Sequence, residues 1–285
     1  MRSILAVVST LLIFGSACSD YSRSTSPTGG NTYPPGSPPV ATPQIRSIML
    51  DATDTVIVAG NSTTLSVFGL DADGQRVAKL DNATFFNSNA FSFLVSPQGL
   101  LTALYSSFRP FRADISASVV VDGVTLTASR RFDVRSAAPD RFDFLTSLIP
   151  EDVVPEQPPS AADGIVYLTV TDAGIDFTLL WSHLMGTPIG AHIHGPVGFG
   201  GVAGVLADFP IGVGFPDHGL LRGTLTPESI RASGGGGPIS MDSLITLIKT
   251  RSVYVDIHSA ERPAGEVRGT PFASGTTDVV GGVPF

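Results

Sequence analysis

Four of the five histidines fall between residues 192 and 258, and they are the side chains best suited to chemistry. His192 and His194 are two residues apart in a β-rich run, and His258 closes another such run. Residues i and i+2 of a strand point to the same side of a sheet, so His192 and His194 project together. By the same rule, Asp256 shares a face with His258. A His-x-His pair with a distant third histidine is a common way to build a copper or zinc site.

The same residues leave two other interpretations open. The imidazoles could hydrogen-bond to the backbone and to nearby carboxylates, or they could recognise a ligand or a protein. His218 is a fourth candidate metal ligand, with Asp217 beside it in the sequence. Redox catalysis at such a site would also require an open metal position and a path for the substrate. No catalytic residue is therefore assigned, and copper or zinc is the cofactor that the histidine pattern suggests.

A second polar group accompanies the histidines. Glu266 and Arg268 are two residues apart on one predicted strand, so they share a face. Together with Asp256 they predict a structural network of hydrogen bonds or ion pairs.

Short β-rich runs must position these side chains. In the second half of the chain, strands are predicted at residues 142–145, 164–170, 174–181, 189–194, 253–258 and 266–269. Residues 240–250 carry apolar side chains at helical spacing and predict a single short amphipathic helix.

The first half of the chain also has a period of two. From Ile45 onward, β-rich runs alternate with turn signals about every 8–12 residues, which is typical of an antiparallel sandwich. Asp122-Gly123 between two valine-rich runs predicts a hairpin, because both central residues of a type I′ turn need a positive φ. The chain is therefore predicted to be all-β, with two antiparallel sandwich-like domains.

Composition excludes several classes of protein. The chain has 17 Lys and Arg against 25 Asp and Glu, a net charge of −8, which argues against general nucleic-acid binding. A single cysteine excludes a disulfide-stapled scaffold. The 31 glycines and 22 prolines are too many for a long-helix or coiled-coil protein.

Residues 140–272 resemble the CHRD domain, named from chordin and common in bacterial secreted proteins. The resemblance rests on GAHIHGP at 190–196, LRGTLT at 221–226, YVDIHS at 254–259 and PAGEVRG at 263–269, with a looser VVPEQPP at 153–159. One departure is Arg262, where many members carry a histidine. The family implies a β domain but brings no general biochemical activity. The AHIHG run also resembles the metal-binding strand of copper–zinc superoxide dismutases, over a handful of residues.

Residues 45–136 resemble a bacterial immunoglobulin-like domain of the kind repeated in surface adhesins. The similarity lies in VAGNSTTL at 58–65, the Asp73-Gly74 turn and SPQGLLTA at 96–103. Phe85-Phe86 departs from the family, which usually has a tryptophan strand. The resemblance implies a sandwich, and we expect it to serve as a spacer. It implies no specific activity, because this fold hosts many roles.

The N-terminal residues predict a signal for export from the cytoplasm. Arg2, an apolar run from Ile4 to Phe14 and a small-residue site are typical of a signal peptide over residues 1–17. Cys18 follows as in a bacterial lipobox, which implies acylation, although Gly15 replaces the usual aliphatic residue. Cleavage by an ordinary signal peptidase, leaving a free thiol, is the alternative. Residues 18–44 are rich in Ser, Thr, Gly and Pro and predict a disordered linker, and residues 273–285 a C-terminal tail.

These patterns together predict a lipid-anchored protein of the bacterial cell envelope, outside the cytoplasm, at an outer membrane or the cell surface. The expected role is non-enzymatic binding, adhesion or presentation, with the membrane and an extracellular or periplasmic protein or polymer as partners and no nucleic acid. The alternative is a copper- or zinc-binding module with redox activity of a dismutase-like kind.

Overall fold

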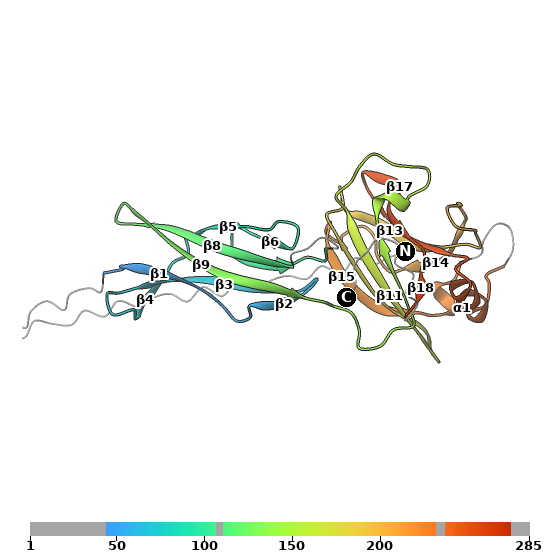
Figure 1. The fold of residues 1–285 in the computed structure, drawn as a ribbon, viewed down its shortest axis with the longest axis horizontal. Helices are drawn as coiled ribbons and strands as arrows, with labels where there is room; N and C mark the ends of the chain where they lie inside the picture. Colours follow the sequence, from blue (N-terminus) through green and yellow to red (C-terminus); the bar gives the residue numbers. More distant parts are fainter. Residues whose placement is uncertain (1–43, 107–110, 232–236, 275–285) are drawn as a thin grey trace, which may run out of the picture. The chain divides into compact units, whose positions relative to one another are not determined.

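The computed structural model describes residues 44–106, 111–231 and 237–274 of the chain (Figure 1). The predicted signal peptide, Cys18 and the predicted linker up to residue 43 lie outside the described residues, as do residues 275–285 of the predicted tail. Within the described ranges, no helix has the length and apolar character needed to cross a membrane.

Residues 47–135 form two β-sheets. The first has the strand order β1-β3-β7-β6, with β4 paired to β3. Its strands are β1 (Ser47–Ala52), β3 (Ser62–Leu70), β4 (Arg76–Lys79), β6 (Phe93–Val95) and β7 (Leu100–Ala103). The second has the order β2-β9-β8-β5. Its strands are β2 (Val56–Val58), β5 (Thr84–Asn87), β8 (Arg112–Val121) and β9 (Val124–Arg135). Pairing is antiparallel except between β2 and β9, which run parallel.

The two-residue period of the sequence builds this sandwich. In β8, Ala113, Ile115, Ala117 and Val119 are buried while the residues between them face outward. Phe93 and Phe132, both fully buried, meet edge to face with ring centroids 6.4 Å apart. The predicted Asp122-Gly123 turn is confirmed, since it joins β8 to β9 with φ of 49° and 78°.

Residues 144–273 form two further sheets. The first has the order β15-β12-β11-β10-β18. Its strands are β10 (Phe144–Leu148), β11 (Asp163–Thr171), β12 (Gly174–Ser182), β15 (Gly219–Leu225) and β18 (Phe272–Ala273). The second has the order β14-β13-β16-β17. Its strands are β13 (Pro188–His194), β14 (Val205–Phe209), β16 (Tyr254–Ser259) and β17 (Arg262–Gly269). All of these pairs are antiparallel.

One core lies between these two sheets. It takes Val166, Leu168 and Leu179 from the first sheet and Ile193 and Val255 from the second, all at most 1% exposed. Such side chains each contribute roughly 1.5–3 kcal/mol when buried. The architecture confirms the predicted all-β class.

The helical elements are short. The predicted helix at 240–250 is confirmed as α1 (Met241–Lys249), which begins where the Ser240 side chain accepts a hydrogen bond from the Ser243 amide. Leu244 and Ile248 of α1 belong to the core between the sheets. Two 3₁₀ turns, η1 (Pro150–Asp152) and η2 (Pro227–Ser229), each begin at a proline.

Several predicted boundaries were wrong. The strand predicted at 142–145 lies at Phe144–Leu148, and the one predicted at 266–269 begins at Arg262. Strands β14 (Val205–Phe209), β15 (Gly219–Leu225) and β18 (Phe272–Ala273) were not predicted. In β14, five residues between glycine- and proline-rich loops carry too little periodicity.

Candidate metal centre

His192, His194 and His258 lie on the outer face of the sheet β14-β13-β16-β17. In β13, Ala191 and Ile193 are fully buried in the core, which turns His192 and His194 to the opposite face. In β16, Val255 and Ile257 face the core in the same way. Alternation alone therefore sets the side of the sheet on which the polar groups gather.

Strand register brings the polar groups opposite each other. His192 pairs with Asp256, His194 with Tyr254, and Gly190 with His258. Directly opposed residues have their Cβ atoms about 4.5–5.5 Å apart, so short polar side chains at these positions reach one another. Two antiparallel strands thus deliver three imidazoles and one carboxylate to a single spot.

The ligand-type atoms converge on one carboxylate oxygen. Oδ1 of Asp256 lies 3.1 Å from Nε2 of His194 and 3.1 Å from Nε2 of His258. Nδ1 of His192 is 3.8 Å from the same oxygen. One ligand atom from each of the four residues lies within 4.8 Å of the others.

Backbone carbonyls hold the other nitrogens of two of these rings. Nδ1 of His194 lies 2.9 Å from the carbonyl oxygen of Ala203, in the loop between β13 and β14. Nδ1 of His258 lies 3.0 Å from the carbonyl oxygen of Pro263, next to the turn between β16 and β17. A carbonyl can only accept, so each Nδ1 carries the hydrogen and each Nε2 of the neutral ring is left with a lone pair.

The centre is buried and its facing atoms lack hydrogen-bond partners. The side chains of His194 and Asp256 are 10% and 7% exposed. Among the described residues, no hydrogen bond is made by Asp256 Oδ1, by Nε2 of His194 and His258, or by Nδ1 of His192. Two lone pairs and a carboxylate oxygen face each other there, an arrangement that only a proton or a cation between them relieves.

The pKa values follow from this crowding. Burial raises the pKa of Asp256, but His194 and His258 outweigh it and the net pKa is lowered. Burial lowers the pKa of His258, but Asp256 and the Pro263 carbonyl leave it raised overall. The pKa of His192 is lowered, chiefly by burial and despite Asp256. Asp256 therefore raises the pKa of both imidazoles, but at His192 burial and the two neighbouring histidines outweigh it.

This geometry lies inside a stretch that matches a known family. Residues 144–270 match the CHRD domain. The match begins at the first residue of β10 and ends just after β17, so it contains all four residues of the centre. No curated protein matches the chain.

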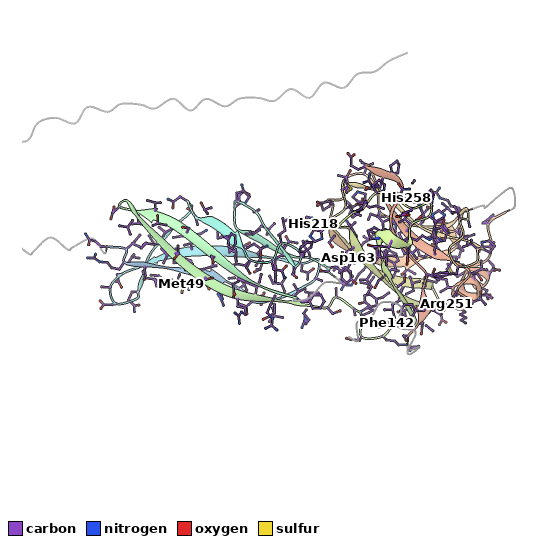
Figure 2. The ribbon with its side chains drawn as sticks, turned by 45° about the horizontal axis from the view of Figure 1, so that its top comes forward. Met49, Phe142, Asp163, His218, Arg251 and His258 are labelled. Carbon is purple, nitrogen blue, oxygen red and sulfur yellow. The ribbon has the colours of Figure 1, made fainter. Side chains whose placement is uncertain are left out.

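Within the CHRD domain, His218 lies apart from the other predicted ligands. It is not among the four grouped residues, and its Nδ1 lies 2.7 Å from Oδ1 of the adjacent Asp217. Figure 2 labels His218 and His258 at separate places on the domain. Sequence alone could not separate His218 from the others, because its position depends on strand pairing between distant segments.

The three residues of the predicted polar network lie in three different sets of contacts. Glu266 is 1% exposed and accepts hydrogen bonds from the hydroxyls of Ser160 and Ser259 and from the Met185 amide. Arg268 donates to the carbonyl of Gly201, and its guanidinium lies 3.5 Å from the centre of the Tyr254 ring. Glu266 and Arg268 thus have separate partners, while Asp256 belongs to the histidine cluster.

Three residues next to the centre were not predicted. The ring of Tyr254 stacks on His194, with centroids 4.7 Å apart and planes 3° from parallel. Asp208 on β14 pairs in register with His192 and forms an ion pair with Arg231. The two-residue spacing of Tyr254, Asp256 and His258 places them on one face, but Asp208 lies on β14, one of the strands that were not predicted.

Proposed function

We propose that the CHRD domain of this chain is a metal-binding module whose centre is formed by His192, His194, His258 and Asp256. The observation that carries the proposal is the meeting of two Nε2 lone pairs with one carboxylate oxygen at 3.1 Å, while both Nδ1 atoms face backbone carbonyls. Metal-ligating histidines characteristically donate their other ring N–H to such an acceptor.

The spacing of the donors fits a small divalent ion. Four ligands about 2.0–2.1 Å from a tetrahedral zinc lie about 3.3 Å from each other. The donor separations from Asp256 Oδ1 are 3.1, 3.1 and 3.8 Å, on either side of that value. The ligand atoms lie up to 4.8 Å apart, so some of them would have to approach one another by up to about 1.5 Å to complete the coordination.

The donor types favour zinc or copper. Imidazole suits Zn²⁺ and Cu²⁺, whereas Ca²⁺ and Mg²⁺ take sets made of oxygen donors. Three nitrogens and one carboxylate oxygen match the first pair. Stoichiometric copper in the natively purified protein is the result that would extend the proposal to dismutase-like redox chemistry.

Metal analysis of the full chain tests the proposal. The protein is stripped with a chelator and dialysed against Zn²⁺ or Cu²⁺, and we expect about one bound ion per chain. The double variant His194→Ala/His258→Ala should bind none, while the control His218→Ala should bind like the unmodified protein. Equal binding by the double variant and the unmodified protein would falsify the proposal.

We also propose that this module is presented at the bacterial cell envelope through a lipid on Cys18. The support comes from the sequence, namely Arg2, the apolar run after it and the position of the cysteine. A CHRD domain is consistent with the expected binding or presentation role. Intact-mass analysis should show a diacyl or triacyl mass on a chain that begins at Cys18, and an unmodified thiol there would overturn this assignment.

A further inference from the structure

His192 enters the centre differently from the other two histidines. Its Nδ1, not its Nε2, is the nitrogen near Asp256, at 3.8 Å, and this Nδ1 is buried without a hydrogen-bond partner among the described residues. Its Nε2 faces the other way and lies 3.5 Å from Oδ1 of Asp208. His194 and His258 show the reverse arrangement, with Nδ1 outward and Nε2 inward.

The ring of His192 is kept in this orientation by its own strand. It folds back over Gly190, where a Cβ atom would lie 2.9 Å from its Cε1 and 3.0 Å from its Nε2. A side chain at this position would displace the ring from where it lies. Gly190 thus limits the ring on one side, and the question that remains is which nitrogen carries the hydrogen.

Asp208 is itself fixed by a charged partner. Its Oδ2 accepts a hydrogen bond from Nε of Arg231, whose backbone amide bonds to the Leu206 carbonyl at 2.8 Å. Ile230 forms an isolated antiparallel β-bridge with Ala207, so the segment that contains Arg231 runs along the outer edge of β14. With Oδ2 occupied, Oδ1 of Asp208 is left buried and without a hydrogen-bond partner among the described residues, facing His192.

We propose that Asp208, held by Arg231, is a positioning residue of the metal centre. It accepts the Nε2–H of His192 and so makes Nδ1 the metal-binding nitrogen of this histidine, opposite to the choice at His194 and His258. The inference rests on the proposed metal-binding function. The 3.5 Å separation is longer than a hydrogen bond and would shorten as the ring closes on a metal.

The tautomers can be read directly. Long-range ¹H–¹⁵N spectra of the zinc-loaded full chain distinguish Nδ1–H from Nε2–H rings. We expect the Nε2–H form for His192 and the Nδ1–H form for His194 and His258. Bound zinc with His192 in the Nδ1–H form overturns this inference and leaves the metal site standing, whereas no bound zinc overturns both.

The variant Asp208→Asn gives a second test. Arg231 would hold the single amide oxygen and turn the NH₂ group toward His192, which favours the Nδ1–H tautomer and blocks the ligand nitrogen. We expect zinc affinity to fall by about tenfold to a hundredfold, the usual effect of losing such a partner. An affinity within about twofold of the unmodified protein would count against the inference.

Removing the arginine should then rescue the asparagine. In Asp208→Asn/Arg231→Ala the amide is free to rotate and present its oxygen to His192, so zinc should bind more tightly than in Asp208→Asn. A purely structural role for the pair predicts the opposite, because the double variant would lose a further contact. Zinc binding as weak as, or weaker than, that of Asp208→Asn would therefore refute the positioning role.

Discussion

Two sheet faces in this protein carry ionisable residues at directly opposed cross-strand positions, but one pair is exposed to solvent and the other is buried. On β8 and β9, Asp114 and Arg131 pair at 3.1 Å and remain 52% and 63% exposed. On β13 and β16, His192 and Asp256 are opposed in the same way but are only 19% and 7% exposed. The sheet geometry is the same, and the surrounding cover differs.

The cover consists of loops and neighbouring side chains. The loop after β13 brings the Ala203 and Gly201 carbonyls over the face. Tyr254 stacks on His194, and the guanidinium of Arg268 lies over the Tyr254 ring. An exposed ion pair is solvated whether or not it forms, so it contributes little. A covered one must be satisfied by protein or by an ion, which makes it a candidate site.

The largest effect on zinc affinity is expected from a substitution of Asp256. In Asp256→Asn the shared anionic oxygen is lost, so we expect zinc affinity to fall more than about a hundredfold. The amide can donate to a histidine Nε2, so the metal-free CHRD domain should gain roughly 1 kcal/mol of stability at pH 8. Equilibrium dialysis and urea unfolding check the two parts, and unchanged zinc affinity would contradict the first.

Urea unfolding can be followed at this domain alone. Trp181 is the single tryptophan of the chain, is 1% exposed, and lies in the core between the two CHRD sheets. Its fluorescence therefore reports unfolding of the domain that holds the centre.

A smaller effect is expected at Gly190. Alanine there would push the His192 ring away from the centre, because the new Cβ would lie 2.9 Å from Cε1. We expect zinc affinity to fall about tenfold, as for other supporting positions of a metal site. Gly198→Ala is the matched control, since nothing lies within 4 Å of its Cβ position. Equal losses in the two variants would show that the effect is not specific to His192.

A weaker, pH-dependent effect is expected without metal. The folded pKa of His258 is raised, so its contribution is fully present below about pH 6.5 and is lost as pH rises through the folded value. The lowered pKa of His192 changes the free energy of unfolding only below about pH 6.5, and that of Asp256 only below about pH 3.8. Neither residue therefore affects it at higher pH. The free energy of unfolding should therefore fall as the pH rises from about 6.5 through the folded pKa of His258.

The slope of the free energy of unfolding against pH that His258 alone can cause is at most about 1.4 kcal/mol per pH unit. Trp181 fluorescence in urea with a chelator present measures it, and His258→Gln should flatten it. A free energy of unfolding that rises across this pH range would show that His258 does not bind its proton more tightly in the folded state.

The smallest effect is expected on the exposed face. Asp114→Asn removes the ion pair with Arg131, and we expect the stability to change by less than about 0.5 kcal/mol. Zinc affinity should not change. Calorimetry of the full chain measures the stability, and a loss above about 1 kcal/mol would remove the contrast between the two faces.

Much of this architecture could be predicted from the sequence because it depends on local pattern. The period of two in β8, the Asp122-Gly123 turn and the helical spacing of apolar residues at 240–250 each act within a few residues. The same rule placed His192 with His194, and Asp256 with His258, before any pairing was known.

Pairing itself could not be predicted. His192 and Asp256 are 64 positions apart, and only the β13–β16 register brings them together. Asp208 depends on β14, whose five residues give no clear period, and His218 has the same residue type as the ligands without the same place in the sheet. Long-range register, rather than residue chemistry, limited the prediction of the site.

The outer acceptors of His194 and His258 are peptide carbonyls, and this affects how the protein can vary. Every amino acid has a carbonyl, so a substitution at Ala203 or Pro263 that keeps the backbone path also keeps the acceptor. The imidazoles have no such freedom, because their donor atoms belong to the side chain. The loops around the centre can therefore diverge in sequence while it persists, and homologous centres are better recognised by backbone shape than by loop residues.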